Sequence, residues 1–353
     1  MRTVSSFALI LAACSGPRVA NTPPGNHLLV LNKADATLSL IETGSGVTVD
    51  QVPTGDGPHE VAVSRDGRIA VVANYGAQTP GHTLTIYDTV ERVVKHTYDI
   101  APHRRPHGIE FLDNRTTVLV TSETSKAVLE IDVRSGKVKR VLDTGAELSH
   151  MLAITPDRKR VFTANIGSNS VSAIDLASGE LVKVVPTGAK PEAIAVSPDG
   201  REVWVGHNEA NKIVILDARS LEIVGEIPCG PVPIRVEFTP DGRLALASAA
   251  GSGELVLIDT RERREVQRIA LERLAVPRVG AQPGQDATNP LPVGIEIEPR
   301  GRFAFVATIA ADRLAVIDLK ERKLAGHIAT GHAPDGMAWA RLPHHGKHDA
   351  RFD

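Results

Sequence analysis

The stretch that decides the fold is Asn169–Asn211, which has the sequence NSVSAIDLASGELVKVVPTGAKPEAIAVSPDGREVWVGHNEAN. It contains four short apolar runs that are rich in Val, Ile and Ala, with turn sequences such as ASGE and SPDG between them. The runs are too short for stable helices, and their β-branched residues favour strands. Pro and Gly in the turns supply the fixed negative and the positive φ that tight reversals need. This stretch therefore predicts four antiparallel strands.

The same pattern recurs along the chain, and an apolar–acidic pair marks each copy. Successive copies are 42 to 46 residues apart, except that 59 residues separate the last two. The pairs are Ile41-Glu42, Tyr87-Asp88, Ile131-Asp132, Ile174-Asp175, Leu216-Asp217, Ile258-Asp259 and Ile317-Asp318. Seven copies of a four-stranded unit at this period predict an all-β fold, a seven-bladed β-propeller with four antiparallel strands per blade.

The chain ends indicate how the ring closes. We name the strands of a blade A to D from the inside outward. The first runs, HLLVLNK, TLSLIET and VTVDQVP, fit strands B, C and D of a blade that lacks strand A, whereas the final run at 336–342 lacks B, C and D. We expect the C-terminal inner strand to join the N-terminal strands, so that the propeller covers 27–342 and has no long free edge.

The repeat resembles that of the YVTN-repeat β-propeller family, over roughly residues 27–340. The segments SNSVSAIDLASGELVKVVPTG and PEAIAVSPDGREVWVGHN carry the likeness. Membership in that family implies the propeller fold, but it does not imply one activity, because propellers serve many functions.

The N-terminus has the features of a bacterial export signal. Arg2 precedes an apolar run, and Leu11-Ala12-Ala13-Cys14 resembles the lipobox of bacterial lipoproteins. The resemblance implies a signal peptide at 1–13, a lipid on Cys14 and a tether at 14–26. It also implies a periplasmic, lipid-anchored protein, with the outer membrane favoured because Ser15 rather than Asp follows the cysteine. The alternative is an ordinary cleaved signal with a chance cysteine.

Composition excludes some partners. The net charge is −2, so no general attraction to nucleic acid is expected. Aromatic residues are only 3% of the chain, which disfavours stacking platforms for single-stranded nucleic acid. If Cys14 is acylated, Cys229 has no cysteine partner. We expect a monomer whose membrane contact is the lipid on Cys14, and whose further partner is an unknown protein or small-molecule ligand.

One face of the ring carries the variable loops. The D–A and B–C loops emerge together on what we call the D–A/B–C face, while the uniform turns SRDG, SPDG and TPDG lie on the other face. The insertion at 271–290 belongs to a D–A loop and should lie over or beside the central channel. The tail at 343–353 is rich in His and could bind metal, although such tails are more often disordered.

The first position of strand A should lie at the channel mouth on the D–A/B–C face. Seven positions drawn at random from a chain with 13 His in 353 residues would hold far less than one His, yet this column holds three. Around the ring the column is Asp335, His59, His107, His150, Glu192, Ile234 and Val293.

These residues define the candidate site. The polar members of the column, together with Arg105 and Arg235, are candidate ligand-binding residues. We expect a binding or scaffold module that uses this surface. The alternative is a metal-dependent hydrolase, lyase or oxidoreductase in which His59, His107 and His150 bind a divalent transition metal. A third option is a structural propeller of a cell-surface layer, and the polar residues could also merely hydrate the pore. No cofactor can be named from the sequence.

Overall fold

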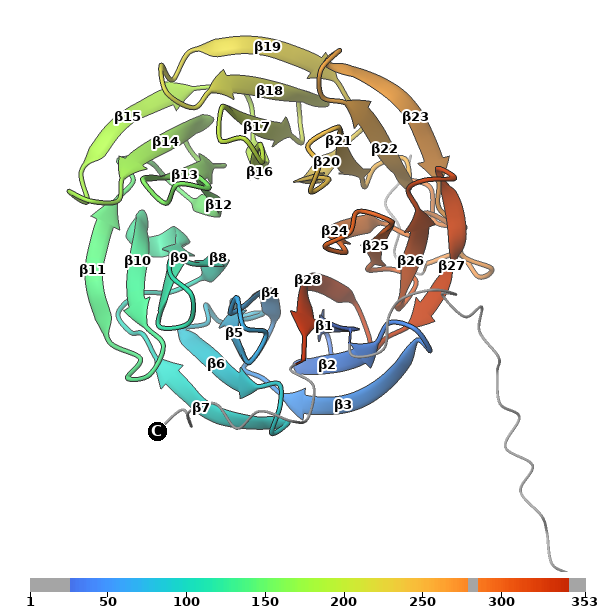
Figure 1. The fold of residues 1–353 in the computed structure, drawn as a ribbon, viewed down its shortest axis with the longest axis horizontal. Coiled ribbons are helices and arrows are strands. Elements are labelled where there is room, and N and C mark those ends of the chain that lie inside the picture. The colour runs from blue at the N-terminus through green and yellow to red at the C-terminus, as the bar shows by residue number, and fades with distance from the viewer. Residues whose placement is uncertain (1–25, 279–284, 343–353) are drawn as a thin grey trace, which may run out of the picture.

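The computed structural model describes residues 26–278 and 285–342 and confirms the propeller (Figure 1). In the described part of the chain 28 strands form seven four-stranded antiparallel sheets around a central axis. The predicted signal peptide, Cys14, most of the tether and the His-rich tail lie outside the described residues. One short 3-10 helix, Glu123–Ser125, is the helical element of the described residues, and none there is long and apolar enough to cross a membrane.

The blades follow one another in chain order. Blade one contains β28 (Pro334–Arg341), β1 (Asn26–Asn32), β2 (Thr37–Glu42) and β3 (Val47–Pro53). Blades two to four contain β4 (Pro58–Val63), β5 (Ile69–Asn74), β6 (Thr83–Asp88), β7 (Val93–Asp99), β8 (Pro106–Phe111), β9 (Thr117–Ser122), β10 (Ala127–Asp132), β11 (Val138–Asp143), β12 (Ser149–Ile154), β13 (Arg160–Asn165), β14 (Ser170–Asp175) and β15 (Leu181–Pro186). Blades five to seven contain β16 (Pro191–Val196), β17 (Glu202–His207), β18 (Lys212–Asp217), β19 (Ile223–Pro228), β20 (Pro233–Phe238), β21 (Leu244–Ala249), β22 (Glu254–Asp259), β23 (Arg264–Ala270), β24 (Pro292–Ile297), β25 (Phe303–Thr308), β26 (Arg313–Asp318) and β27 (Lys323–Ala329).

The ring closes as the sequence predicts. Strand β28 pairs antiparallel with β1, and His27 lies opposite Ala340 in the register. The first blade is therefore built from both ends of the propeller, which removes the free strand edge that would otherwise invite aggregation.

The apolar core lies between neighbouring blades. Strand B of each blade is almost completely buried, as in IAVVAN of β5, whereas strand D alternates with solvent, as in VVKHTYD of β7. Each sheet face packs on the next sheet, so a strand with both faces covered has a nearly continuous apolar sequence. This arrangement gives the ring a rigid frame on which loop residues are positioned.

A repeated backbone contact positions the loops of the D–A/B–C face. In every blade the residue just before strand A has a left-handed φ, between 49° and 57°, and six of these seven residues are not glycine. Its carbonyl oxygen accepts a hydrogen bond of 3.0–3.3 Å from the first backbone N–H of the B–C loop. The left-handed conformation is costly for residues with a Cβ, so this contact holds the start of strand A in a defined orientation.

Glycines allow neighbouring inner strands to approach closely at the axis. A Cβ on Gly336 would lie 2.2 Å from the His59 carbonyl oxygen, and one on Gly294 would lie 2.3 Å from the Asp335 carbonyl oxygen. A Cβ on Gly108 would likewise lie 2.7 Å from the Leu152 backbone nitrogen in blade four. Each of the three directly follows a residue of the predicted first-position column, where an added Cβ would clash with the backbone of the neighbouring inner strand.

Candidate functional site

Two rings of residues form the mouth of the channel. The inner ring is the first position of strand A that the sequence predicts: Asp335, His59, His107, His150, Glu192, Ile234 and Val293. The outer ring is the first residue of each B–C loop, which donates the repeated backbone hydrogen bond: Lys33, Tyr75, Glu123, Ile166, Asn208, Ala250 and Ile309. We call these fourteen residues the mouth.

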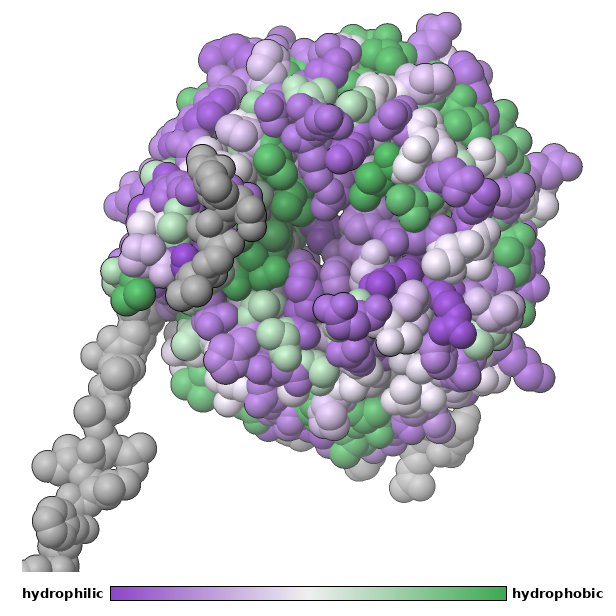
Figure 2. All heavy atoms as spheres, turned by 180° about the vertical axis from the view of Figure 1, so that it is seen from behind, coloured by the Kyte–Doolittle hydropathy of each residue, from purple (hydrophilic) through white to green (hydrophobic). Residues whose placement is uncertain are grey.

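The mouth has a polar and an apolar side. Blades one to five supply every charged, imidazole or phenol group of both rings, whereas blades six and seven supply only aliphatic residues. Ile234, Val293 and Ile309 pack with the apolar cluster between blades seven and one. Figure 2 shows the resulting hollow at the centre of this face, with hydrophobic surface along one side and hydrophilic surface around the rest.

The three predicted histidines lie together. The ring centroids of His107 and His150 are 3.6 Å apart, and those of His59 and His107 are 5.2 Å apart. The Tyr75 ring lies 4.4 Å from His59 and 5.3 Å from His107. His107 is the most deeply placed: its exposed fraction is 5%, and its Nδ1 has no hydrogen-bond partner.

Glu123 links the aromatic groups into a hydrogen-bonded chain. His150 Nδ1 lies 2.5 Å from Glu123 Oε1, and the Tyr75 hydroxyl donates to Glu123 Oε2 at 2.8 Å. The Glu123 side chain is buried, with an exposed fraction of 8%. A buried carboxylate that accepts from two ring groups fixes their orientation.

Hydrogen bonds and burial determine the tautomer of His59 and the protonation state of His59 and His107. His59 Nδ1 lies 2.8 Å from the Gly57 carbonyl oxygen, so this nitrogen is the donor and Nε2 is the free acceptor. Burial lowers the pKa of His59, although Asp335 opposes the shift. Burial, with contributions from His150 and His59, holds the pKa of His107 well below its usual range. These two rings are therefore neutral near pH 7.

The charged groups of the polar side are largely paired. Lys33 Nζ bonds Asp335 Oδ2 at 2.9 Å, and the Asn208 amide donates to the Glu192 carboxylate. Arg105 stacks its guanidinium 4.4 Å from the centre of the Tyr75 ring and donates to the carbonyl oxygens of Gly76 and Ala77, both at 3.2 Å.

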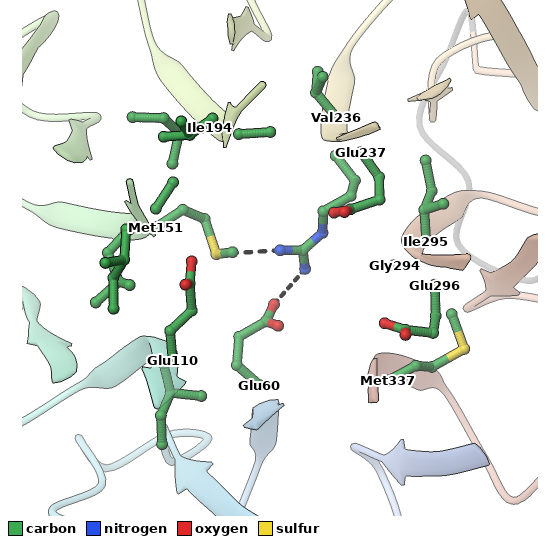
Figure 3. A pocket seen from close by; sticks show the side chains of 17 residues that line it. Glu60, Glu110, Met151, Ile194, Val236, Glu237, Gly294, Ile295, Glu296 and Met337 are labelled. Carbon is green, nitrogen blue, oxygen red and sulfur yellow. Dashed lines mark hydrogen bonds and ion pairs between the residues drawn. The ribbon is translucent and has the colours of Figure 1, made fainter. Parts of the chain in front are cut away.

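Arg235 forms the floor of the mouth. It extends from blade six across the channel, where its guanidinium pairs with Glu60 of blade two and its Nη1 lies 3.4 Å from Met151 Sδ of blade four (Figure 3). Both charged side chains are almost buried, with exposed fractions of 12% and 11%. Arg235 thus lies below the inner ring, although the sequence predicts it as a ligand-binding residue of the mouth.

A cavity of about 350 Å³ continues from this floor. Glu110, Glu237 and Glu296 direct their carboxyl groups into it (Figure 3). Burial and the neighbouring Glu237 raise the pKa of Glu110 to about 8, and burial raises the pKa of Glu237 to about 7 although Arg235 opposes it. Burial and Glu237 also raise the pKa of Glu296 well above its usual range.

These carboxyl groups predict a loss of stability at mildly alkaline pH. A raised folded-state pKa means that the folded chain holds the proton more tightly, so stability falls as pH rises from about 4.5 to about 8. The buried histidines act in the opposite direction, but only below about pH 6.5. Between pH 6.5 and 8.5 we expect the unfolding temperature to fall, with about 2 kcal/mol lost at Glu110.

Thermal unfolding of the native chain and of Glu110→Gln across this pH range measures the effect. The variant should show a clearly shallower decline, because an amide has no proton to lose. Parallel curves for the two proteins would contradict the assignment to Glu110.

The geometry does not support the metal alternative. Among residues 26–278 and 285–342, no group of three or more His, Cys, Asp or Glu side chains is placed to hold a metal ion.

The insertion at 271–290 lies beside the mouth in its described parts. Arg273 donates to the Ser252 carbonyl oxygen at 3.0 Å, and Asn289 donates to that of Ala250 at 2.8 Å. Glu272 pairs with Arg313 at 3.2 Å. These contacts anchor it on the B–C loop of blade six and on blade seven. The remainder of the insertion lies outside the described residues.

The outer ring and the cavity carboxylates were not predicted from the sequence. Tyr75 and Glu123 each lie directly after strand B. A comparison of this position across the seven repeats, like the comparison made for the first position of strand A, would have identified them. Glu110, Glu237 and Glu296 are each the fifth residue of their strand A, and Glu60 is the third residue of β4. Charged residues in an apolar strand of a propeller indicate a channel-facing position.

The fold and these rings define a seven-bladed β-propeller with an amphipathic channel mouth. A family model described as "YNCE-like beta-propeller" matches residues 113–243, and no curated protein matches the sequence.

Solved structures show the same fold at low identity. Hydrazine synthase from Kuenenia stuttgartiensis has a TM-score of 0.69 at 16% identity, over 90% of this chain and 99% of that one. A functionally unknown protein from Desulfotomaculum acetoxidans DSM 771 has a TM-score of 0.73 at 16% identity, over 90% and 100%. The dihydro-heme d1 dehydrogenase NirN, in complex with DHE, has a TM-score of 0.62 at 17% identity, over 90% and 66%. At these identities the likeness concerns the fold alone.

Proposed function

We propose that this protein is a propeller of the YVTN-repeat type that acts as a binding module, and that its ligand occupies the mouth on the D–A/B–C face. The observation that carries the proposal is the hollow with one hydrophobic side (Figure 2), at a mouth where His107 is buried and its Nδ1 has no partner. A buried polar atom without a partner is unfavourable in the free protein, and a ligand that bonds to it removes that penalty.

A neutral fluorescent probe tests the binding surface. N-phenyl-1-naphthylamine is apolar, uncharged near pH 7 and bright when it leaves water. We expect saturable fluorescence enhancement with the native chain and at least a tenfold weaker affinity in Ile309→Asp, because a carboxylate there disrupts the apolar side.

The matched control is Val47→Asp, which places the same charge at an exposed aliphatic position on an outer strand. It should bind the probe as the native chain does. Equal binding by Ile309→Asp and the native chain would overturn the proposed surface.

An enzyme is the second candidate, because Glu123 and His150 form the carboxylate–imidazole pair that orients a general base. In this interpretation His150 Nε2 takes a proton from water or from a bound substrate. Hydrolysis of p-nitrophenyl acetate that falls to the buffer rate in both His150→Gln and Glu123→Gln would favour it. Unchanged hydrolysis in both variants would remove it.

We also propose that Cys14 carries a lipid and that the propeller lies in the periplasm, held at the outer membrane. The support is the Leu11-Ala12-Ala13-Cys14 sequence and the apolar run before it. Incorporation of labelled palmitate in a bacterial host should be abolished by Cys14→Ser. Equal labelling of the variant, or no labelling of the native chain, would contradict the anchor.

A further inference from the structure

We infer that the molecule bound at the mouth is a small organic amine, with its protonated nitrogen among the imidazoles and Glu192 and its apolar body on blades six and seven. This inference rests on the proposed binding function and names the chemical class of its ligand. Four properties of the mouth support it. Some of its hydrogen-bond acceptors have no donor, and its cationic groups are already paired. Its carboxylates outnumber its cations, and one of its sides is aliphatic.

The polar side offers acceptors that have no donor. His59 Nδ1 donates to the Gly57 carbonyl, and His150 Nδ1 donates to the Glu123 carboxylate. In a neutral imidazole the second nitrogen is then an unprotonated acceptor, so Nε2 of the neutral His59 ring carries a free lone pair. An ammonium group has three N–H donors and no acceptor, which is the complement of this arrangement.

One gap in the mouth has the spacing that an ammonium group can bridge. His150 Nε2 and Glu192 Oε1 are 3.8 Å apart, too far for a direct hydrogen bond. Glu192 Oε1 is an acceptor, and His150 Nε2 is an acceptor when this ring is neutral with Nδ1 as the donor to Glu123. One nitrogen at about 2.8 Å from each of them could donate to both.

His107 provides an independent indication of a ligand. Its ring lies between those of His59 and His150, its exposed fraction is 5%, and its Nδ1 has no partner. A neutral imidazole carries one lone pair and one N–H, so this ring can accept from an ammonium group or from a hydroxyl beside it.

The cations of the mouth are already paired, which disfavours an anionic ligand. Lys33 bonds Asp335, Arg235 bonds Glu60, and Arg105 donates to backbone carbonyl oxygens. Burial keeps His59 and His107 uncharged, so they do not supply the positive charge that a carboxylate or phosphate would need.

Carboxylates outnumber the fixed cations on the polar side and its floor. Glu192 accepts a hydrogen bond from the neutral Asn208 amide and lies 3.8 Å from His150 Nε2, and Glu123 bonds the Tyr75 hydroxyl and His150. Asp335 and Glu60 balance only Lys33 and Arg235. A hollow with walls of low dielectric constant concentrates this negative potential and attracts cations.

The aliphatic side selects among cations. Ile234, Val293 and Ile309 present hydrocarbon and no polar side-chain atom, so a metal ion or a fully polar cation would leave them unused. An amine with a hydrocarbon body buries this surface at about 25 cal/mol per Å². Both sides of the mouth are then occupied by one molecule.

Displacement of N-phenyl-1-naphthylamine by matched eight-carbon compounds tests the class of ligand at pH 7.5. We expect n-octylammonium to displace the probe at a concentration at least tenfold lower than octanoate or octanol. In Glu192→Gln, which retains an acceptor for Asn208 and removes the charge, the ammonium preference should fall at least fivefold.

The outcomes separate the two proposals. Failure of the probe to bind, or binding insensitive to Ile309→Asp, would overturn the binding function itself. Probe binding at the mouth with equal displacement by octylammonium and octanoate, or with an ammonium preference that Glu192→Gln leaves unchanged, would overturn the amine while the binding function stands.

Discussion

Gly336→Ala is expected to lower the free energy of unfolding by about 3 kcal/mol, near the upper end of the usual cost of overpacking. The added Cβ would lie 2.2 Å from the His59 carbonyl oxygen and 2.9 Å from the Glu60 Cα. Both atoms belong to the backbone of β4, so no side chain can rotate away. Either β28 or β4 must move outward, and β28 is the strand that closes the ring.

The loss appears as an unfolding temperature lower by at least about 5 °C. Gly225→Ala is the matched control, because Gly225 also lies in a strand and its nearest neighbour is the flexible end of Arg263, 3.2 Å from the new Cβ. Its unfolding temperature should stay within about 1–2 °C of the native value. Equal stability of the two variants would show that the inner strands can separate without cost.

Most of the fold could be predicted, because each copy of the repeat specifies the same strands and turns. The turn residues, the strand period and the unpaired runs at the two chain ends each specify local structure, and together they require seven blades and the pairing of β28 with β1. The insertion at 271–290 has no counterpart in the other copies, so the repeat could place its ends but not its contacts with Ser252 and Ala250.

The site could be predicted only in part, because contacts between blades do not follow from one column of the repeat. The first-position column correctly predicted that His59, His107 and His150 lie close together. It did not reveal that Glu123, from the loop of blade three, bonds His150 of blade four, or that Tyr75 of blade two bonds Glu123. These contacts depend on side-chain reach across a blade boundary, which sequence spacing does not specify.

Arg235 also shows why one position of the repeat is not enough to predict which residues face the channel. Its neighbour Ile234 occupies the mouth, whereas Arg235 faces the channel and reaches two other blades. A bulge in the pairing of β20 with β21, between Pro233 and Arg235, allows two successive residues to approach the axis. All other blades have a register shift at the corresponding position, so the residue that follows the first-position column can approach the axis throughout this ring.

Arg235→Met is expected to destabilise the protein by about 3–5 kcal/mol at pH 8, because it leaves Glu60 in the channel without its counter-charge. Burial already raises the pKa of Glu60, and Arg235 is the principal group that opposes this shift. Without the guanidinium the pKa of Glu60 rises further. At pH 5 the carboxyl group is then protonated, and the difference from the native chain should shrink to the lost packing and hydrogen bonds.

Urea unfolding at pH 8 and pH 5 measures both effects, and the double variant Glu60→Gln/Arg235→Met supplies the control. Removing both charges together eliminates the unpaired carboxylate, so the double variant should recover at least half of the stability lost at pH 8. Its stability should also change less with pH than that of Arg235→Met. A double variant no more stable than Arg235→Met would mean that the arginine acts by packing against Met151 and not by balancing Glu60. Full native stability of Arg235→Met at pH 8 would mean that water in the channel already solvates the carboxylate.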